Sequence, residues 1–416
     1  MGGGVLPVLR ERAAAARAAG GAGRARPPAE ALPPPALMLA PMELLGDRVF
    51  RRAHARAVGG CDEYCTEFLR VPDRGTMTAN LARGIAGHYD PSELRPGGPP
   101  LSVQLMGATP ERLVAVTERL LDVEAARRPP HINLNCGCPA NTVTGKGAGS
   151  SLLREPQRLH DCVAAMVDAA GGRAPVTVKM RSGFESADLF EDNVRAAEAA
   201  GAAMIAVHPR TKAQGYRGDA DWSKIALAKR TVEAIPVMGN GDVTSVAKAR
   251  LMLRETGCDG IMIGRGAVQD PLIFWRIRRA LAGEGAEAGG ADDEVGAVVG
   301  FLEAFMEELV ASRADYEELG SKRELKSRVD RVKQLAKYLL AGCPSLKAVL
   351  RTPSKSVHPD DFVRLVMRNV AADWVGREVG PTVNEFSHDN PHRQRAKVAA
   401  VKVAELRRGA EATAPC

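Results

Sequence analysis

The sequence has no long uninterrupted apolar run, and its cysteines lack the spacing of common metal sites. A membrane-spanning helix needs roughly 18 to 20 consecutive apolar residues, and no stretch of the 416 residues approaches that length. Eight cysteines in a chain of this size are not a disulfide framework. Neither Cys61 with Cys65 nor Cys136 with Cys138 has the CxxC spacing typical of zinc ligands. We therefore expect no membrane span, no metal and a reducing compartment.

Composition divides the chain into parts. It is 45% hydrophobic and 26% charged with a net charge of +7, which is typical of a globular protein, and it is too long for a single core of about 250–300 residues. Residues 1–36 are mostly Ala, Gly, Pro and Arg, so we expect a disordered arm. The arm is rich in arginine like an organellar transit peptide but has no serine, so the expected location is cytoplasmic, with an organelle as the alternative. We interpret residues 284–295 as an acidic linker and 373–416 as a basic, flexible tail.

Short apolar runs alternate with longer helical patterns between Leu37 and Ala280. The eight runs begin at Leu37, Cys61, Leu101, His131, Val176, Met204, Pro236 and Gly260. Eight strands separated by helices over about 250 residues are typical of a parallel (β/α)8 barrel, which we place at residues 37–283. A doubly wound α/β sheet is the alternative, but it would want a GxGxxG motif after the first strand, and LAPMELLGD does not contain one.

Polar residues share one face of several predicted strands. Alternation along each strand places them inside the barrel, near the carboxyl ends; they are Gln104, Asn135, Lys179, His208 and Arg210. Burying such groups without partners would cost several kcal/mol in total. Either a polar, partly anionic ligand satisfies them at the barrel mouth, or they satisfy one another.

The last two strands end in glycine-rich turns. Strand seven ends in Gly239-Asn240-Gly241-Asp242 and strand eight in Gly264-Arg265-Gly266. This fold commonly binds phosphate after strands seven and eight, where glycine permits close backbone approach and arginine can bind two oxygens. The pattern predicts a phosphate site, but does not distinguish a flavin mononucleotide from a sugar phosphate.

Cys138 stands apart from the other cysteines. It lies in Asn135-Cys136-Gly137-Cys138-Pro139, just after strand four, and Pro139 ends the strand. A free thiol titrates near pH 8.5, so at neutral pH it is mostly protonated and can act as a general acid. A nucleophile would need an activating base, and no histidine is nearby in the sequence. We therefore interpret Cys138 as a proton donor.

Residues 296–372 form a predicted all-helical domain with a basic face. Within it, Leu325, Val329, Val332, Ala336 and Leu339 recur at helical spacing and form an apolar stripe. Other faces of the same helix carry Lys322, Arg323, Lys326, Arg328, Arg331, Lys333 and Lys337. Charge of one sign close to a catalytic barrel favours a phosphate-backbone partner, although a basic run is often only a solvated face.

These motifs resemble the tRNA-dihydrouridine synthase family. LAPME, VQLMG, LNCGCPANTVTGKGAGSSLL, VKMRSGF, HPRTKAQGYRGDADW, MGNGDV and MIGRGA look like the family's motifs, in order and at its spacing, from Leu37 to about Val366. CDEYCTEFLRV, NCGCP and RTKAQGYR are most similar to the bacterial C-type subgroup, the tRNA-dihydrouridine(16) synthases, which act on the D-loop.

The resemblance implies an FMN-dependent oxidoreductase that uses NADPH as reductant and tRNA as substrate. Cys138 would protonate C5 of a uracil that receives a hydride at C6. By matching positions, the residues that would hold FMN are Pro41, Met42, Glu43, Gln104, Lys179, His208, Asn240, Gly241, Asp242, Gly264 and Arg265. Those that would contact tRNA are Arg70, Asn135, Tyr216, Arg331, Lys333 and Arg351.

The chain departs from the family pattern at three positions. Leu44 and Pro209 stand where the family usually has glycine, and Leu335 stands where it has an aromatic residue. We expect a monomer. Two other functions remain open from the sequence: an FMN barrel that acts on a free pyrimidine, and a tRNA-binding protein without catalysis.

Overall fold

The structure is a computed structural model that describes residues 4–19, 32–94, 99–140, 147–283, 291–312 and 321–374. The chain divides into two compact units, one of residues 1–51 with 60–264 and one of residues 52–59 with 265–416. The boundary expected at residue 283 therefore falls after Gly264 instead. The helices that follow the last strand group with the C-terminal helices, since α10 (Arg265–Gln269) packs on α13 (Lys322–Leu339).

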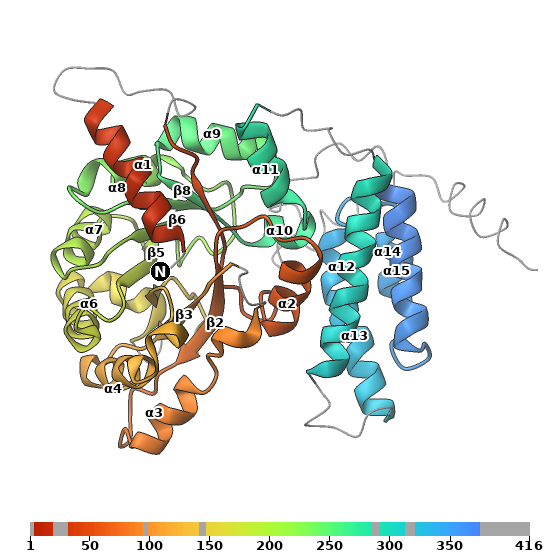
Figure 1. Ribbon diagram of the computed structural model, residues 1–416, viewed down its shortest axis with the longest axis horizontal. Coiled ribbons are helices and arrows are strands. Elements are labelled where there is room, and N and C mark those ends of the chain that lie inside the picture. Colours follow the sequence, from red (N-terminus) through yellow and green to blue (C-terminus); the bar gives the residue numbers. More distant parts are fainter. Residues whose placement is uncertain are drawn as a thin grey trace, which may run out of the picture. The chain divides into compact units, whose positions relative to one another are not determined.

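The first unit is built on a closed parallel barrel (Figure 1). Its strands are β1 (Ala36–Leu39), β2 (Tyr64–Arg70), β3 (Leu101–Met106), β4 (Ile132–Cys136), β5 (Val176–Gly183), β6 (Ile205–Thr211), β7 (Val237–Asn240) and β8 (Gly260–Ile263). Each strand pairs in parallel with the next, β1 pairs with β8, and a parallel bridge between Met38 and Glu63 joins β1 to β2. The predicted (β/α)8 barrel is confirmed, and all eight predicted runs contain a strand.

Helices connect and surround these strands, as Figure 1 shows. They are α2 (Arg48–Ala57), α3 (Ala79–Ala86), α4 (Pro110–Leu121), α6 (Pro156–Ala170), α7 (Phe190–Ala199), α8 (Ser223–Thr231) and α9 (Val246–Thr256), with short 3-10 helices η2 (Pro91–Glu93), η3 (Ala125–Arg127) and η4 (Gly149–Arg154). Several begin at side-chain caps. The Ser245 and Thr78 oxygens accept hydrogen bonds from the third backbone amide of α9 and of α3.

The barrel interior has an apolar side and a polar side. The apolar side joins β1, β2, β6, β7 and β8 through Met38, Ala40, Cys65, Met204, Ala206, Met238 and Met262. The polar side lies on β3, β4 and β5, where buried amides and hydroxyls hydrogen-bond one another. The alternation predicted for these strands is therefore confirmed. Pro209 interrupts it locally, because proline has no N–H to donate and the register between β5 and β6 shifts beside it.

Residues 5–19 form a helix, α1, so the prediction that the whole segment 1–36 is disordered is wrong there. Val5, Leu6 and Leu9 recur at helical spacing and are buried against the apolar side of the barrel interior. The approach is close: a Cβ on Gly260 of β8 would lie 2.7 Å from Leu9 Cδ2. These few apolar residues order a segment whose remaining composition is that of a disordered chain.

Other predictions fall partly outside the described residues: residues 20–31 of the arm, residues 284–290 of the linker and residues 375–416 of the tail. Helix α12 begins at Ala291, within the predicted linker, so that prediction is wrong at its C-terminal end. No helix in the described ranges is both long enough and apolar enough to cross a bilayer.

The second unit is all helical. It contains the end of α2 with α10, α11 (Ile273–Leu281), α12 (Ala291–Ala311), α13, α14 (Leu346–Arg351) and α15 (Pro359–Trp374). Helix α15 packs on both α12 and α13. The predicted apolar stripe of α13 is confirmed, with Leu325 only partly buried and Leu335 buried in addition. Arg328 does not belong to the basic face, because it is buried in an ion pair of 2.7 Å with Glu324.

We predict that Leu9→Ala lowers the free energy of unfolding by about 2–4 kcal/mol, since it removes a fully buried side chain and leaves a cavity against Gly260. Arg10→Ala, which changes an exposed residue of the same helix, is the control and should cost less than about 0.5 kcal/mol. Urea unfolding of both variants measures the difference. Equal stability of the two would mean that α1 does not pack on the barrel.

Candidate active site

The predicted catalytic and cofactor residues of the first unit lie in or after the carboxyl ends of its strands. In a parallel barrel these ends share one face, the mouth. Pro41, Met42 and Glu43 follow β1, Cys138 follows β4, and Gly264 follows β8. Arg70 is the last residue of β2. The fold therefore brings these predicted residues to the same end of the barrel.

The backbone around Cys138 is fixed from several directions. Asn135 Oδ1 accepts hydrogen bonds from the backbone N–H groups of Gly137 and Cys138, each at 2.9 Å. The Cys138 carbonyl accepts from Ser150 Oγ at 2.9 Å. Arg181 Nε donates to the Gly137 carbonyl at 2.9 Å. The loop that carries the thiol is thus held without any ligand.

The Cys138 thiol is nearly buried, with 8% of the residue exposed. Burial raises the pKa of Cys138, against a hydrogen bond from Ala140 that lowers it. The Glu43 carboxylate raises this pKa further, whereas the guanidinium groups of Arg70 and Arg181 lower it. The net direction is upward, so the thiol keeps its proton at neutral pH. Cys138 can therefore donate a proton, as the sequence predicted.

Lys179 is a cation without a counter-ion. Its pKa is lowered to about 8, chiefly by burial and also by the neighbouring Arg181, while Cys65 and Cys138 act in the opposite direction. Among the described residues, its ammonium group forms no hydrogen bond or ion pair. A buried ammonium beside another cation favours a ligand that carries negative charge. This side chain therefore fits a bound anion, such as a reduced flavin or a phosphate.

The amides at the mouth are already paired, in contrast to Lys179. Asn135 Nδ2 donates to Gln104 Oε1 at 2.8 Å, and Gln104 Nε2 donates to Asn133 Oδ1 at 2.7 Å. For the amides, the alternative of mutual pairing is therefore the one observed. The amides satisfy one another, whereas the lysine remains available to a ligand.

Arg210 and Asp242 form a second internally paired group. The Asp242 carboxylate binds Arg210 through two hydrogen bonds of 3.0 and 2.6 Å and accepts a third from the Ala220 N–H at 2.7 Å. Arg210 also lies 3.3 Å from His208 Nε2. This ion pair engages both charges within the protein, and the binding of the cofactor by Asp242 stays a prediction.

The glycine-rich turns after β7 and β8 make contacts that stabilise the barrel itself. Gly241 has a φ of 118°, a conformation that favours glycine. Asn240 Nδ2 donates to the Met262 carbonyl at 2.7 Å, which joins the two strands. Gly264 contacts Met42, whose sulfur would lie 3.3 Å from a Cβ there. Arg265 begins the short helix α10 and is the first residue of the longer segment of the second unit.

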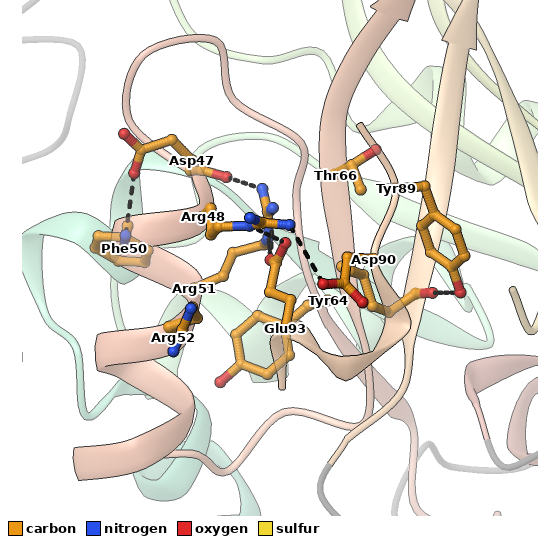
Figure 2. A network of polar contacts seen from close by, with 12 residues as sticks. Asp47, Arg48, Phe50, Arg51, Arg52, Tyr64, Thr66, Tyr89, Asp90 and Glu93 are labelled. Carbon is orange, nitrogen blue, oxygen red and sulfur yellow. Dashed lines mark hydrogen bonds and ion pairs between the residues drawn. The ribbon is translucent and has the colours of Figure 1, made fainter. Parts of the chain in front are cut away.

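An ion-pair network with a buried centre, Arg51 and Glu93, anchors the loop that carries Pro41, Met42 and Glu43 (Figure 2). Arg51 pairs with Glu93 at 2.5 Å and donates to the Gly46 carbonyl at 2.7 Å. Arg48 pairs with the same Glu93 at 3.0 Å and reaches Asp90 at 3.8 Å.

The departure at Leu44 appears in the backbone of this loop. Leu44 has a φ of 66°, in the region that favours the glycine usual at this position in the resembling family. Its N–H donates to Glu67 Oε1 at 2.6 Å.

Tyr216 and Arg181 lie together beyond β5 and β6. The Tyr216 ring lies 6.0 Å from the His208 ring and 5.3 Å from the Arg181 guanidinium, and Tyr216 is 37% exposed. Arg181 also donates to the Thr211 and Gly215 carbonyls. The sequence identified Tyr216 but missed Arg181, although Arg181 shares the inward face of its strand with Lys179. Its contacts connect the loop of Tyr216 with the loop of Cys138.

The predicted tRNA contacts of the second unit lie on α13 and α14. Lys333 Nζ donates to the Thr352 carbonyl, next to Arg351 at the end of α14, so these two predicted residues lie close together. Arg331 donates to Gln334 and lies 5.9 Å from the Phe305 ring. Arg351 is exposed. Lys333 therefore holds two helices together as well as contributing charge.

A family model and the sequences of related proteins agree on one family. The sequence model of the family described as dihydrouridine synthase (Dus) matches residues 38–339. The tRNA-dihydrouridine(16) synthase of Ralstonia nicotianae is 37% identical over 290 residues, which are 68% of this chain and 83% of that enzyme. The enzyme of the same name from Escherichia coli K12 is 34% identical over 236 residues, 56% of this chain and 73% of that enzyme. A solved complex of 2-naphthoyl-CoA reductase aligns with a TM-score of 0.42 at 10% identity, over 60% of this chain and 50% of that one.

We predict that Asp242→Asn lowers the free energy of unfolding by about 3 kcal/mol, because it leaves the buried Arg210 guanidinium without its carboxylate. Asp192→Asn changes an exposed carboxylate at the start of α7 and should cost only a few tenths of a kcal/mol, about 0.3–0.5. Denaturant titration of the purified, flavin-free variants gives both values. If Asp242→Asn left the stability unchanged, the carboxylate would be free for a ligand after all.

Proposed function

Because the chain belongs to the dihydrouridine synthase family, whose enzymes are flavin-dependent oxidoreductases, we propose that it reduces a uridine of tRNA to 5,6-dihydrouridine. The observation that carries this proposal is the proton-bearing thiol of Cys138, held at the barrel mouth within a family match that covers residues 38–339. The tRNA-dihydrouridine(16) synthases among the relatives favour position 16, in the D-loop, as the target.

We propose FMN as the flavin and NADPH as its reductant. The chemistry that a bound, reduced flavin supplies is a hydride for C6 of the uracil ring. Lys179 is the side chain that best supports an anionic ring, since it is a partly buried ammonium without a counter-ion. The other residues proposed to hold the cofactor are Pro41, Met42, Glu43, Gln104, His208, Asn240, Gly241, Gly264 and Arg265. Asp242 is proposed to act indirectly, by fixing Arg210 next to His208.

Cys138 is proposed to protonate C5 of the uracil. Its pKa is raised by burial, so the thiol is in the protonated form that this role needs. The two backbone hydrogen bonds to Asn135 and the contact of Arg181 with Gly137 hold the thiol in place before substrate arrives. Positioning of this kind lowers the entropic cost of bringing acid and base together.

Substrate recognition is proposed to involve an aromatic side chain, an amide and several cations. Tyr216 is exposed enough to stack with a base, and Asn135 Nδ2 keeps a second proton for a carbonyl oxygen. The target base must leave its stack to reach a barrel mouth. Arg70, Arg331, Lys333 and Arg351 are proposed to bind the phosphate backbone. A reaction on a free pyrimidine would give these cations no role.

We predict that Cys138→Ala keeps binding FMN and tRNA but reduces uridine in tRNA at least about a hundredfold more slowly, because the proton donor is lost. Cys162→Ala, which removes a buried thiol of α6, is the control and should keep the wild-type rate. Dihydrouridine formed in unmodified tRNA, measured under single turnover, gives the rates. Free uridine assayed in parallel tests the rival small-molecule function, and wild-type rates in Cys138→Ala would remove the thiol from the chemistry.

We also predict that tRNA affinity falls steeply with salt, because each phosphate contact releases a counter-ion. Arg351→Ala should weaken binding and reduce the slope of log affinity against log salt by about one. Arg364→Ala, whose guanidinium already pairs with Asp361, serves as the matched control and should leave the slope unchanged. Filter binding from low to moderate salt measures both. A flat response of the wild type would contradict a role of the helical unit in binding RNA.

A further inference from the structure

A continuous line of buried polar side chains runs through the barrel, from the start of its strands to the Cys138 loop. Four members lie in β3, β4 and β5, and the other two directly precede β2 and β4. They are Glu63, His131, Thr177, Asn133, Gln104 and Asn135, and none is more than 8% exposed. Two belong to the proposed site, and the other four have no role in it so far.

The line begins at a carboxylate below the strands. Glu63 Oε2 accepts a hydrogen bond of 2.8 Å from the backbone N–H of Val5, the first residue of α1. Glu63 Oε1 lies 2.7 Å from His131 Nε2, and both side chains are fully buried. This contact does not have the geometry of a hydrogen bond, and neither atom has a hydrogen-bond partner among the described residues. His131 Nδ1 in turn lies 2.9 Å from Thr177 Oγ1.

The line continues upward through three amides. Asn133 Nδ2 donates to Thr177 Oγ1 at 2.8 Å, and Gln104 Nε2 donates to Asn133 Oδ1 at 2.7 Å. Asn135 Nδ2 donates to Gln104 Oε1 at 2.8 Å. Asn135 Oδ1 then accepts the backbone N–H of Cys138 at 2.9 Å. An unbroken series of contacts thus joins the Glu63 carboxylate to the loop of the proposed proton donor.

All donors in this series point the same way, toward Glu63. A carboxylate cannot donate, so its closeness to His131 favours the tautomer that carries the proton on Nε2 and keeps a lone pair on Nδ1. The Thr177 hydroxyl donates to that lone pair and accepts from Asn133. Each amide nitrogen then points to the preceding residue of the series: Asn133 to Thr177, Gln104 to Asn133, and Asn135 to Gln104. Hydrogen bonds in such a series polarise and strengthen one another.

This direction determines which polar atoms the mouth offers. The side-chain oxygens of both residues accept hydrogen bonds within the protein. Gln104 Oε1 accepts from Asn135 Nδ2, and Asn135 Oδ1 accepts from the backbone N–H of Cys138. Each amide nitrogen keeps a second proton that can bind a carbonyl oxygen. A reversed amide would present an oxygen instead, which repels the carbonyl groups of flavin and uracil rings. The orientation therefore decides whether these two residues attract or repel such a ligand.

We propose that Glu63, His131, Thr177 and Asn133 are positioning residues that fix the amide orientations of Gln104 and Asn135 and, through Asn135, the backbone of Cys138. No proton moves along the series. The proposal rests on the proposed function for what the mouth binds, but the hold on Cys138 does not depend on it. It also gives α1 a second role, because the N-terminal amide of that helix supports the Glu63 carboxylate.

Thr177→Val tests the proposal, because valine has nearly the shape of threonine but neither donates nor accepts. It interrupts the series between His131 and Asn133 and should weaken FMN binding to the flavin-free protein about tenfold, measured by flavin fluorescence. It should also lower kcat about tenfold with little change in the KM for tRNA. Iodoacetamide should modify Cys138 several-fold faster, about threefold or more, because its loop is less firmly held.

Two matched variants separate positioning from packing. Thr177→Ser restores the hydroxyl and should return FMN affinity, kcat and Cys138 reactivity close to wild type. Thr117→Val makes the same change at a fully buried threonine of α4 whose hydroxyl has no hydrogen-bond partner among the described residues, and it should change none of the three. If Thr177→Val fails to fold, Glu63→Gln, which keeps the side-chain shape and removes the charge, replaces it with the same expected results.

The outcomes distinguish the proposal from the function on which it partly rests. A wild-type protein that neither binds FMN nor reduces tRNA contradicts the proposed function, and the reactivity of Cys138 still tests the positioning series. A Thr177→Val protein that matches wild type in FMN affinity, kcat and Cys138 reactivity overturns the series. So does a Thr117→Val protein that loses as much as Thr177→Val, since the effect would then be one of packing alone.

Discussion

Polar side chains inside a closed barrel have no water to bond with, and this constraint governs the whole first unit. An amide or hydroxyl buried without a partner costs about 1–3 kcal/mol, so the buried amides and hydroxyls on β3, β4 and β5 need one another as partners. The hydrogen bonds that join Thr177, Asn133, Gln104 and Asn135 meet that requirement with side chains from neighbouring strands. The result is a mouth whose dipoles are fixed before a ligand arrives, which is the condition under which dipoles contribute most to catalysis.

The same constraint explains why the two sides of the interior differ. On the apolar side, methionine and alanine side chains fill the space but leave the start of the strands to be covered, and α1 covers them with Val5, Leu6 and Leu9. On the polar side, the first amide of α1 binds Glu63. One helix therefore serves both sides. Residues that look like part of an unstructured arm become part of the barrel core.

The sequence was sufficient for the barrel and for the position of Cys138, because both depend on local patterns. Strand alternation identified the inward faces, and Pro139 marked the end of β4. It was insufficient wherever a residue's partner is distant in the chain. The pairing of Asp242 with Arg210, 32 residues earlier in the chain, is one example. Glu63 and His131 stand 68 positions apart, and no spacing rule connects them. The order of α1 likewise depends on a surface that only the closed barrel creates.

Lys179 and Arg181 show how the fold divides charge between structure and chemistry. They lie two residues apart on the inward face of β5, yet Arg181 donates to the carbonyls of Gly137, Thr211 and Gly215. A guanidinium suits that task, because it has five donors in a fixed plane. Lys179 has only its ammonium, whose pKa burial lowers to about 8. An anion beside it opposes the effect of burial and raises that pKa, so ligand and proton each favour the binding of the other. Arg181 therefore stabilises the loop that carries the Cys138 thiol, whereas the charge of Lys179 remains available to a ligand at the barrel mouth.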